Sequence, residues 1–246
     1  MLKNILLTLV LLFSSLYAYD ARLNNYPETK EWLKDADTNG ESAYNIGVIY
    51  HQYIKDDTKA IKWFKKAYVM NDNDASIDAI INLAAIFIDL KEYKRAEEWY
   101  KKGISKESID ANFGLGLLYK KLHQYNDAVF YYKKAYKMGD VSSANSLGFL
   151  YYHSLKDNKN AEVWYKKAVS KNNKKAIGNL AKLYHKQNKD ELGAAYLIAL
   201  IDNGYSKSKV LGYLKNKWQL NDVTIQQAYK LQQTLDIPKH YTGGID

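Results

Sequence analysis

The chain of 246 residues contains no cysteine and only 2 prolines. Without cysteine it has no disulfide bond, no thiolate metal site, no cysteine nucleophile and no cysteine-linked lipid. Two prolines and 13 glycines are also too few turn-forming residues for a β-sandwich or β-barrel, which need many tight turns. The rest of the composition, 47% hydrophobic and 26% charged, is typical of a globular protein rather than of a disordered chain.

Arginine is almost absent, since Arg22 and Arg95 are the only two among 36 basic residues. The basic residues outnumber 27 acidic ones, and the formal net charge is +9. Such an excess suits nucleic acids or membrane surfaces, but base recognition and forked phosphate contacts favour arginine over lysine. We therefore expect a solvated lysine-rich exterior and no nucleic-acid partner, with a genuine anion-binding face as the alternative.

The first 18 residues have the order of a secretory signal peptide. Lys3 precedes an apolar run at 5–13, and small residues follow it up to Ala18. The run is shorter than the roughly 20 residues that span a bilayer, and no later run reaches that length. We predict cleavage after Ala18 and a periplasmic or secreted protein that is not inserted in the membrane and begins with a short segment at 19–27. An uncleaved anchor is the alternative.

Two short patterns recur along the chain. The first is an apolar segment whose second residue is small, as in LGLLY at 115–119 and LGFLY at 147–151. The second begins with alanine and has an aromatic residue or isoleucine four positions later. The small residues of the first pattern are Gly47, Ala84, Gly116, Gly148 and Ala181, and the blocks of the second are AIKWFKKA at 60–67, AEEWYKKG at 96–103, AVFYYKKA at 128–135, AEVWYKKA at 161–168 and a fifth block that begins at Ala194.

Spacings of three and four place these residues on one face of a helix, so each unit is predicted to contain a helix A followed by a helix B. The small residues let helix A approach its partner closely, and the aromatic residues fill the groove between units. Because one pair cannot bury its apolar face alone, neighbouring pairs stack. We expect an all-α, right-handed α-solenoid of tandem antiparallel helix pairs over 28–236, with five full repeats at about 41–74, 75–108, 109–140, 141–173 and 174–206.

The ends of the array are expected to be capped. The segment 208–236 is predicted to close it, with a polar helix at 222–234 whose N-cap is Asp222. Gly139 and Gly204 are predicted to terminate helices, and 237–246 is expected to be an irregular tail.

These recurring blocks resemble the tetratricopeptide repeat superfamily and, within it, the Sel-one-like repeats. The resemblance covers most of the chain, from about Trp32 to Leu235. The proline that usually ends helix B is absent, and three units carry one extra residue before the alanine, as Sel-one-like repeats often do. The resemblance implies that the side of each helix A turned away from helix B lines a concave face that binds peptides or partner segments.

The expected inner positions of the A helices combine aromatic rings, positive charge and one amide. Such a surface suits an acidic segment or a C-terminal carboxylate, with Asn145 bonding the peptide backbone. The alternative is that the rings form the core between repeats and the lysines a solvated edge. The predicted partner-binding residues are Tyr44, Phe113, Lys120, Asn145, Phe149, Tyr152, Lys182, His185 and Lys186.

No motif for catalysis stands out. The sequence has no HExxH pair, GxSxG elbow or glycine-rich phosphate loop. His153 and His185 lie at similar depths in adjacent units, but two ligands make an incomplete zinc set. We therefore expect no metal, no cofactor and no enzymatic activity, but a non-catalytic protein- or peptide-binding scaffold that is exported to the bacterial envelope.

Two alternatives from other classes stay open. One is a penicillin-recognising or other hydrolase-like exported repeat protein, for which the serine–lysine pairs at 154–156 and 170–171 are the candidate residues. The other is a self-assembling array whose ends stack on each other. The expected oligomeric state of the scaffold is a monomer or a weakly self-associating chain.

Overall fold

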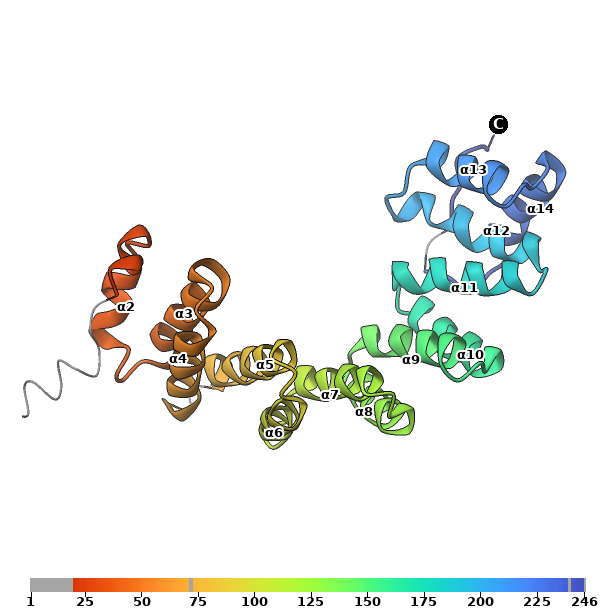
Figure 1. Ribbon diagram of the computed structural model, residues 1–246. Helices are drawn as coiled ribbons and strands as arrows, with labels where there is room; N and C mark the ends of the chain where they lie inside the picture. The colour runs from red at the N-terminus through yellow and green to blue at the C-terminus, as the bar shows by residue number, and fades with distance from the viewer. Residues whose placement is uncertain (1–19, 71–72, 239, 246) are drawn as a thin grey trace, which may run out of the picture. The chain divides into compact units, whose positions relative to one another are not determined.

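The computed structural model describes residues 20–70, 73–238 and 240–245. The predicted signal peptide at 1–18 lies outside these ranges. Every regular element in the described ranges is helical, and no strand occurs there (Figure 1). No helix in the described part of the chain is both long enough and apolar enough to span a membrane. The predicted all-α fold is confirmed.

The helices fall into two compact units, the first ending at Lys106 and the second beginning at Glu107. The first unit contains the short 3-10 helix η1 (Ala21–Asn25), α2 (Thr29–Asp35), α3 (Gly40–Val48) with its π-helical continuation η2 (Ile49–Ile54), α4 (Asp57–Met70), α5 (Asn73–Asp89) and α6 (Tyr93–Ile104). The second contains α7 (Ile109–Lys121), α8 (Tyr125–Lys137), α9 (Val141–His153), α10 (Asn158–Val169), α11 (Lys174–Lys186), α12 (Asp190–Ala199), η3 (Ile201–Asn203), α13 (Lys207–Asn216) and α14 (Asp222–Gln232).

Each A helix packs against the B helix that follows it. The pairs α3/α4 and α5/α6 form in the first unit, and α7/α8, α9/α10 and α11/α12 form in the second. Within a unit, each B helix also packs on the next A helix, as α8 does on α9 and α10 on α11. At the end of the second unit, α13 and α14 both contact α12. This alternation is the stacking of tandem helix pairs in an α-solenoid, as predicted.

Polar side chains begin the A helices of the second unit. Ser108 caps α7, Asp140 caps α9 and Asn173 caps α11, each accepting a hydrogen bond from a backbone N–H in the first turn. These caps satisfy N–H groups that have no partner inside the helix, so they set where each helix starts.

Two predicted helix ends and one predicted helix start can be compared with the structure. Gly139 and Gly204 have φ angles of 107° and 92°, in the left-handed region that favours glycine, which confirms them as helix ends. The N-cap predicted at Asp222 is wrong. Asn221 has an extended backbone and accepts the N–H of Thr224 at 2.8 Å, so Asp222 lies in the first turn instead.

The contact between helix A and helix B depends on the small residue of helix A. A Cβ added to Gly116 would lie 2.4 Å from the ring of Tyr132, and one added to Gly148 would lie 2.4 Å from the ring of Tyr165. Both rings are fully buried. Any side chain at these glycines would collide with the rings. Gly116 and Gly148 therefore hold equivalent places in successive helix pairs, as the repeat pattern predicts.

Polar contacts hold the chain segments at both ends of the described structure. The Asp20 carboxylate pairs with Arg22 at 2.7 Å and with Lys59 of α4 at 2.6 Å. At the other end, the buried Gln232 amide donates to the carbonyl of Tyr241 at 2.7 Å and accepts the N–H of Tyr241 at 3.1 Å. The irregular segment after α14 is thus held against that helix.

Candidate peptide-binding pocket

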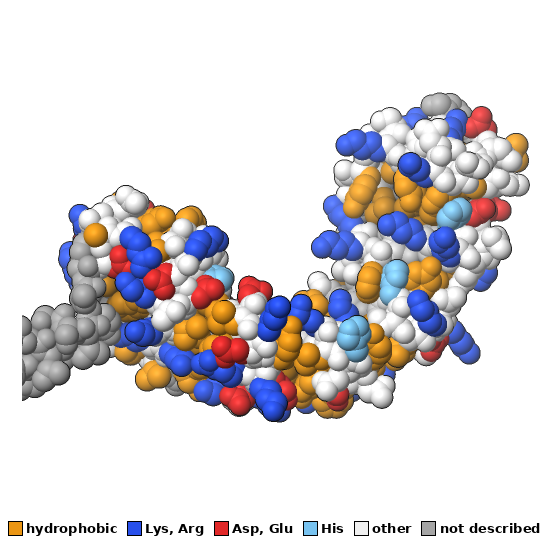
Figure 2. Space-filling model, in the orientation of Figure 1, with side chains coloured by type: hydrophobic (Ala, Val, Ile, Leu, Met, Phe, Trp, Pro, Cys, Tyr) orange, Lys and Arg blue, Asp and Glu red, His pale blue; other side chains and the backbone are white. Residues whose placement is uncertain are grey.

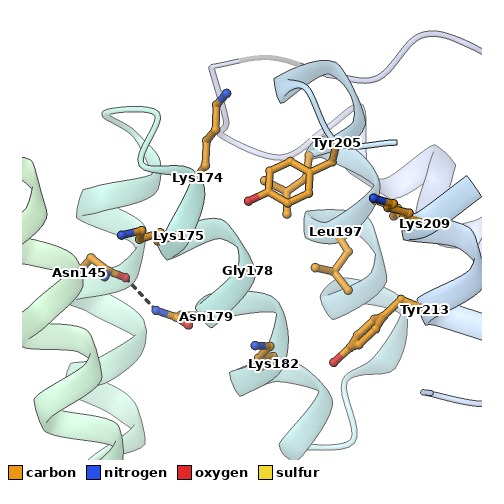
Figure 3. A pocket seen from close by; sticks show the side chains of 12 residues that line it. Asn145, Lys174, Lys175, Gly178, Asn179, Lys182, Leu197, Tyr205, Lys209 and Tyr213 are labelled. Carbon is orange, nitrogen blue, oxygen red and sulfur yellow. Dashed lines mark hydrogen bonds between the residues drawn. The ribbon is translucent and has the colours of Figure 1, made fainter. Parts of the chain in front are cut away.

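A cavity of about 480 Å³ opens in the second unit between α11, α12 and the segment that runs from η3 into α13. Figure 3 shows it between α11 on one side and Leu197, Tyr205 and Tyr213 on the other. We call this cavity the α11–α13 pocket. Its volume lies within the range of about 300 to 1,000 Å³ that is common for ligand sites.

The wall formed by α12 and α13 is apolar. Leu197, Leu200 and Val210 are buried at its base. Tyr205 and Tyr213 lie further out, and their side chains are 46% and 39% exposed. This wall therefore offers aromatic and aliphatic surface that a ligand can reach.

The side formed by α11 is polar and positively charged. Lys174, Lys175 and Lys182 line it from α11, and Lys209 lines it from α13 (Figure 3). No acidic side chain is among the described residues that line the pocket. In Figure 2, blue lysines border orange hydrophobic side chains over α11, α12 and α13. The electrostatic potential of the pocket accordingly favours an anionic ligand.

One hydrogen bond between repeats lies at the edge of the pocket. The Asn179 amide of α11 donates to the Asn145 carbonyl oxygen of α9 at 2.9 Å (Figure 3). The amide NH₂ of Asn145 and the carbonyl oxygen of Asn179 take no part in this bond. A donor and an acceptor of this kind match the hydrogen-bonding groups of a peptide backbone.

Of the nine residues predicted to bind a partner, Asn145 and Lys182 line the α11–α13 pocket. Two others lie within the packing of helix pairs. The ring of Tyr44 is 5.6 Å from that of Phe64, and the ring of Phe113 is 5.7 Å from that of Tyr132. Tyr44 also accepts a hydrogen bond from the Asn82 amide at 3.3 Å. Both rings thus pack within their helix pairs and are partly exposed, and their binding role stays a prediction.

A second group of predicted residues lies on α7 and α9. The Lys120 amine is 5.4 Å from the ring centre of Phe149, whose side chain is 39% exposed. The ring of His153 lies 4.1 Å from Phe149 and 4.6 Å from Tyr152. Burial and the charge of Lys156 lower the pKa of His153, so this imidazole is held in its neutral form. These residues form an aromatic cluster on α7 and α9.

His185 has structural partners of its own. Its ring stacks on Trp218 at 4.1 Å with an interplanar angle of 4°, and its Nδ1 lies 2.5 Å from the Asp190 carboxylate. It therefore joins the end of α11 to α12 and to the segment after α13. Lys186, next to it, is exposed.

The described residues contain no group of three or more His, Asp or Glu side chains that could hold a metal ion. The serine–lysine pairs show no nucleophile and base in contact. Ser170 follows the last residue of α10, and its hydroxyl donates a hydrogen bond to the carbonyl oxygen of Lys167 at 3.1 Å.

Several lining residues were not predicted from the sequence, among them Gly178, Leu197, Tyr205, Lys209 and Tyr213. A signal existed for two of them, because Gly178 and Leu197 both depart from the residues that the other repeats carry at the same positions. Nothing comparable marks the other three, because Lys209 and Tyr213 belong to the closing segment, which does not follow the repeat, and Tyr205 lies in the short connection before it.

Comparison with known proteins identifies the repeats. The sequence pattern of the tetratricopeptide repeat family matches residues 77–105, 109–138 and 141–175. These three segments of the chain are tetratricopeptide repeats. The matched residues run from α5 into α11, and the predicted resemblance is confirmed. No curated protein matches this repeat protein across its sequence.

Solved structures share the fold of this repeat protein. The antigen c5321 of uropathogenic Escherichia coli, which displays an SLR fold, is 22% identical with a TM-score of 0.59, over 80% of this chain and 45% of that one. This chain thus spans less than half the length of c5321. A Sel1 repeat protein from Oxalobacter formigenes is 20% identical, with a TM-score of 0.54, over 87% and 97% of the two chains. PilF of Pseudomonas aeruginosa is 17% identical, with a TM-score of 0.52, over 81% and 99%.

Proteins built from such repeats typically act as interaction scaffolds rather than as enzymes, because stacked repeats present long surfaces to a partner.

Proposed function

We propose that this protein is an exported, non-catalytic scaffold that binds an acidic segment of a partner protein in the α11–α13 pocket. The observation that carries the proposal is the combination of four lysines with an apolar wall in one cavity. Export is supported by the order of charged, apolar and small residues at 1–18.

The lysines and the apolar wall have different roles in this proposal. Lysine side chains are flexible point charges that attract carboxylates and speed up encounter, but they give little specificity alone. The apolar wall supplies the buried contact area that holds the bound segment. The Asn145–Asn179 pair supplies hydrogen bonds to its backbone.

The test is a charge reversal confined to the pocket. The double variant Lys182→Glu/Lys209→Glu is compared with the control Lys137→Glu/Lys159→Glu, which changes the net charge equally at exposed positions on α8 and α10. Each is used to capture partners from envelope extracts, and the bound proteins are quantified by mass spectrometry. We expect the pocket variant to lose partners that the wild type and the control retain. An identical partner set for all three proteins would contradict binding in the pocket.

Two further measurements address the rest of the proposal. The mature protein recovered from a periplasmic fraction is expected to begin at Tyr19 on N-terminal sequencing, as cleavage after Ala18 requires. Incubation with a fluorescent penicillin is expected to give no covalent label. Saturable labelling would instead favour a penicillin-recognising protein.

A further inference from the structure

One position that lines the α11–α13 pocket differs between α11 and the other A helices. Three residues before the small residue, the first four A helices carry a side chain, which is aromatic in α3 and α7; these residues are Tyr44, Ile81, Phe113 and Asn145. Each of the two aromatic rings packs on the buried ring of its helix B, at 5.6 Å from Phe64 and 5.7 Å from Tyr132. A large side chain at this position therefore covers the inside of the helix pair.

In α11 the same position is Gly178. A Cβ added to Gly178 would meet no atom within 4 Å, whereas one added to Gly116 would collide with a ring at 2.4 Å. Close packing therefore requires Gly116 but does not require Gly178. A glycine inside a helix costs about 0.5 to 1 kcal/mol relative to alanine, and at Gly178 no packing contact compensates for that cost.

A second position in the last helix pair also carries a smaller side chain than in the other pairs. Leu197 of α12 stands where the four preceding B helices carry Trp63, Trp99, Tyr131 and Trp164. Gly178 and Leu197 both line the pocket. The cavity thus lies where two positions of the last repeat have smaller side chains than the other repeats have.

We propose that the α11–α13 pocket binds an aromatic side chain of the partner, which lies over Gly178 where Tyr44 and Phe113 lie in α3 and α7, and that acidic residues on both sides of that ring contact the lysines. This inference rests on the proposed function and adds the chemistry of the bound segment. Tyr205 and Tyr213 offer ring faces and edges to the inserted side chain.

The spacing of the lysines indicates the spacing of the acidic residues. Lys174 and Lys182 lie at opposite ends of the pocket along α11 (Figure 3), and their separation of eight positions corresponds to about 12 Å of helix. In an extended peptide, alternate side chains point the same way, and four residues span about 13 Å. An acidic residue two positions before the ring and another two positions after it therefore match the two ends of the pocket.

The probe is the unlabelled peptide Ser-Asp-Ser-Phe-Ser-Asp-Ser, acetylated at its N-terminus and amidated at its C-terminus so that neither end is charged. Its binding to the full mature chain is measured by isothermal titration calorimetry. A second peptide replaces Phe with Ala, and a third moves both Asp residues one position closer to the ring. We expect each change to weaken binding, by about tenfold or more for the loss of the ring.

The matched protein variants are Gly178→Phe, which fills the pocket from within, and Gly178→Ala, which does not. We expect Gly178→Phe to weaken binding of the Phe peptide by about the factor that the ring contributes and to leave the Ala peptide unaffected. Gly178→Ala adds only a Cβ to the same wall and should weaken binding of the Phe peptide less than Gly178→Phe does. Thermal unfolding of both variants tests whether they fold.

Equal binding of the Phe and Ala peptides would overturn the inference but leave the proposed function standing, because the lysines would then bind acidic residues without a ring. Failure of every peptide to bind would also overturn it, and capture from envelope extracts would then decide the proposed function separately. Unchanged binding of the Phe peptide to Gly178→Phe would place its ring outside the pocket.

Discussion

The pairs α7/α8 and α11/α12 are built from the same repeat, but their interiors differ. In α7/α8, Gly116 lies against the buried ring of Tyr132, and Phe113 packs on the same ring. In α11/α12, the corresponding positions are Ala181, Ile198 and Gly178, and a cavity lies beside them. The comparison teaches that residues following the repeat build the packed helix pairs, whereas residues departing from it create the candidate site.

The two pairs also differ in how a buried tyrosine hydroxyl is satisfied. The hydroxyl of Tyr132 in α8 is buried without a hydrogen-bond partner among the described residues. The hydroxyl of Tyr184 in α11 donates to the Glu162 carboxylate of α10 at 2.8 Å. Burial raises the pKa of both phenols, so both keep their protons at neutral pH.

The largest expected effect is the difference in stability between the alanine variants of Gly116 and Gly178. Gly116→Ala should lower the free energy of unfolding by about 1 to 2 kcal/mol, because overlap with the Tyr132 ring outweighs the better helix propensity of alanine. Gly178→Ala should raise it by about 0.5 to 1 kcal/mol, because its Cβ enters open space. Urea unfolding followed by circular dichroism measures both. Equal shifts at the two positions would remove the distinction between a packed pair and an open one.

A smaller difference is expected between two Tyr→Phe variants. Tyr184→Phe should cost about 1 to 2 kcal/mol of unfolding free energy, because the Glu162 carboxylate loses a partly buried hydrogen bond. Tyr132→Phe should cost about 0.5 kcal/mol or less, because it removes a hydroxyl that has no partner among the described residues. Thermal unfolding at pH 7 compares the two variants. A greater loss at Tyr132 would show that its hydroxyl is bonded in solution, for example to water.

The smallest expected effect concerns the first unit, where an ion pair between Asp20 and Lys59 of α4 adds to the packing of aromatic rings. Hydrogen bonds from Arg22 and Lys59 hold the pKa of Asp20 well below its ordinary value, although burial opposes this shift. A carboxyl group with a lower pKa in the folded chain than in the unfolded chain stabilises the folded state at any pH above its ordinary pKa of about 3.9. This stabilisation is lost as the pH falls from there through the pKa of the folded state. Asp20→Asn should therefore cost about 1 kcal/mol at pH 7 and progressively less towards pH 2.

Thermal unfolding of the wild type and Asp20→Asn between pH 7 and pH 2 measures this effect. Gly178→Ala is the control, because its stability difference from the wild type should not change with pH. If the difference in stability between the wild type and Asp20→Asn stays constant with pH, the ionised carboxylate is not the stabilising form.

Much of the fold could be predicted because the repeat makes local and tertiary preferences agree. The close contacts of Gly47 with Phe64, Gly116 with Tyr132 and Gly148 with Tyr165 follow from helical spacing and side-chain size. The N-cap of the last helix was misplaced by one residue, because Asn221 and Asp222 are both good caps and only the backbone conformation distinguishes them.

The candidate site was harder to predict. Helical spacing assigns Tyr44 and Phe113 to the inner face of their helices. A ring at the edge of that face can also pack on helix B, as both rings do here. The pocket lies where side chains are small, at Gly178 and Leu197, and its other wall comes from Tyr205, before α13, and from Tyr213 of α13. No periodic pattern specifies how this part of the chain lies against α11.

The amino-acid sequence by itself determined the tandem helix pairs, because small and aromatic residues recur at helical spacing and no single pair can bury them. The tertiary structure decided which inner residues are packed and which are accessible. It did so by placing α13 and the rings of Tyr205 and Tyr213 opposite a glycine of α11, where the repeat leaves a space that its own side chains do not fill.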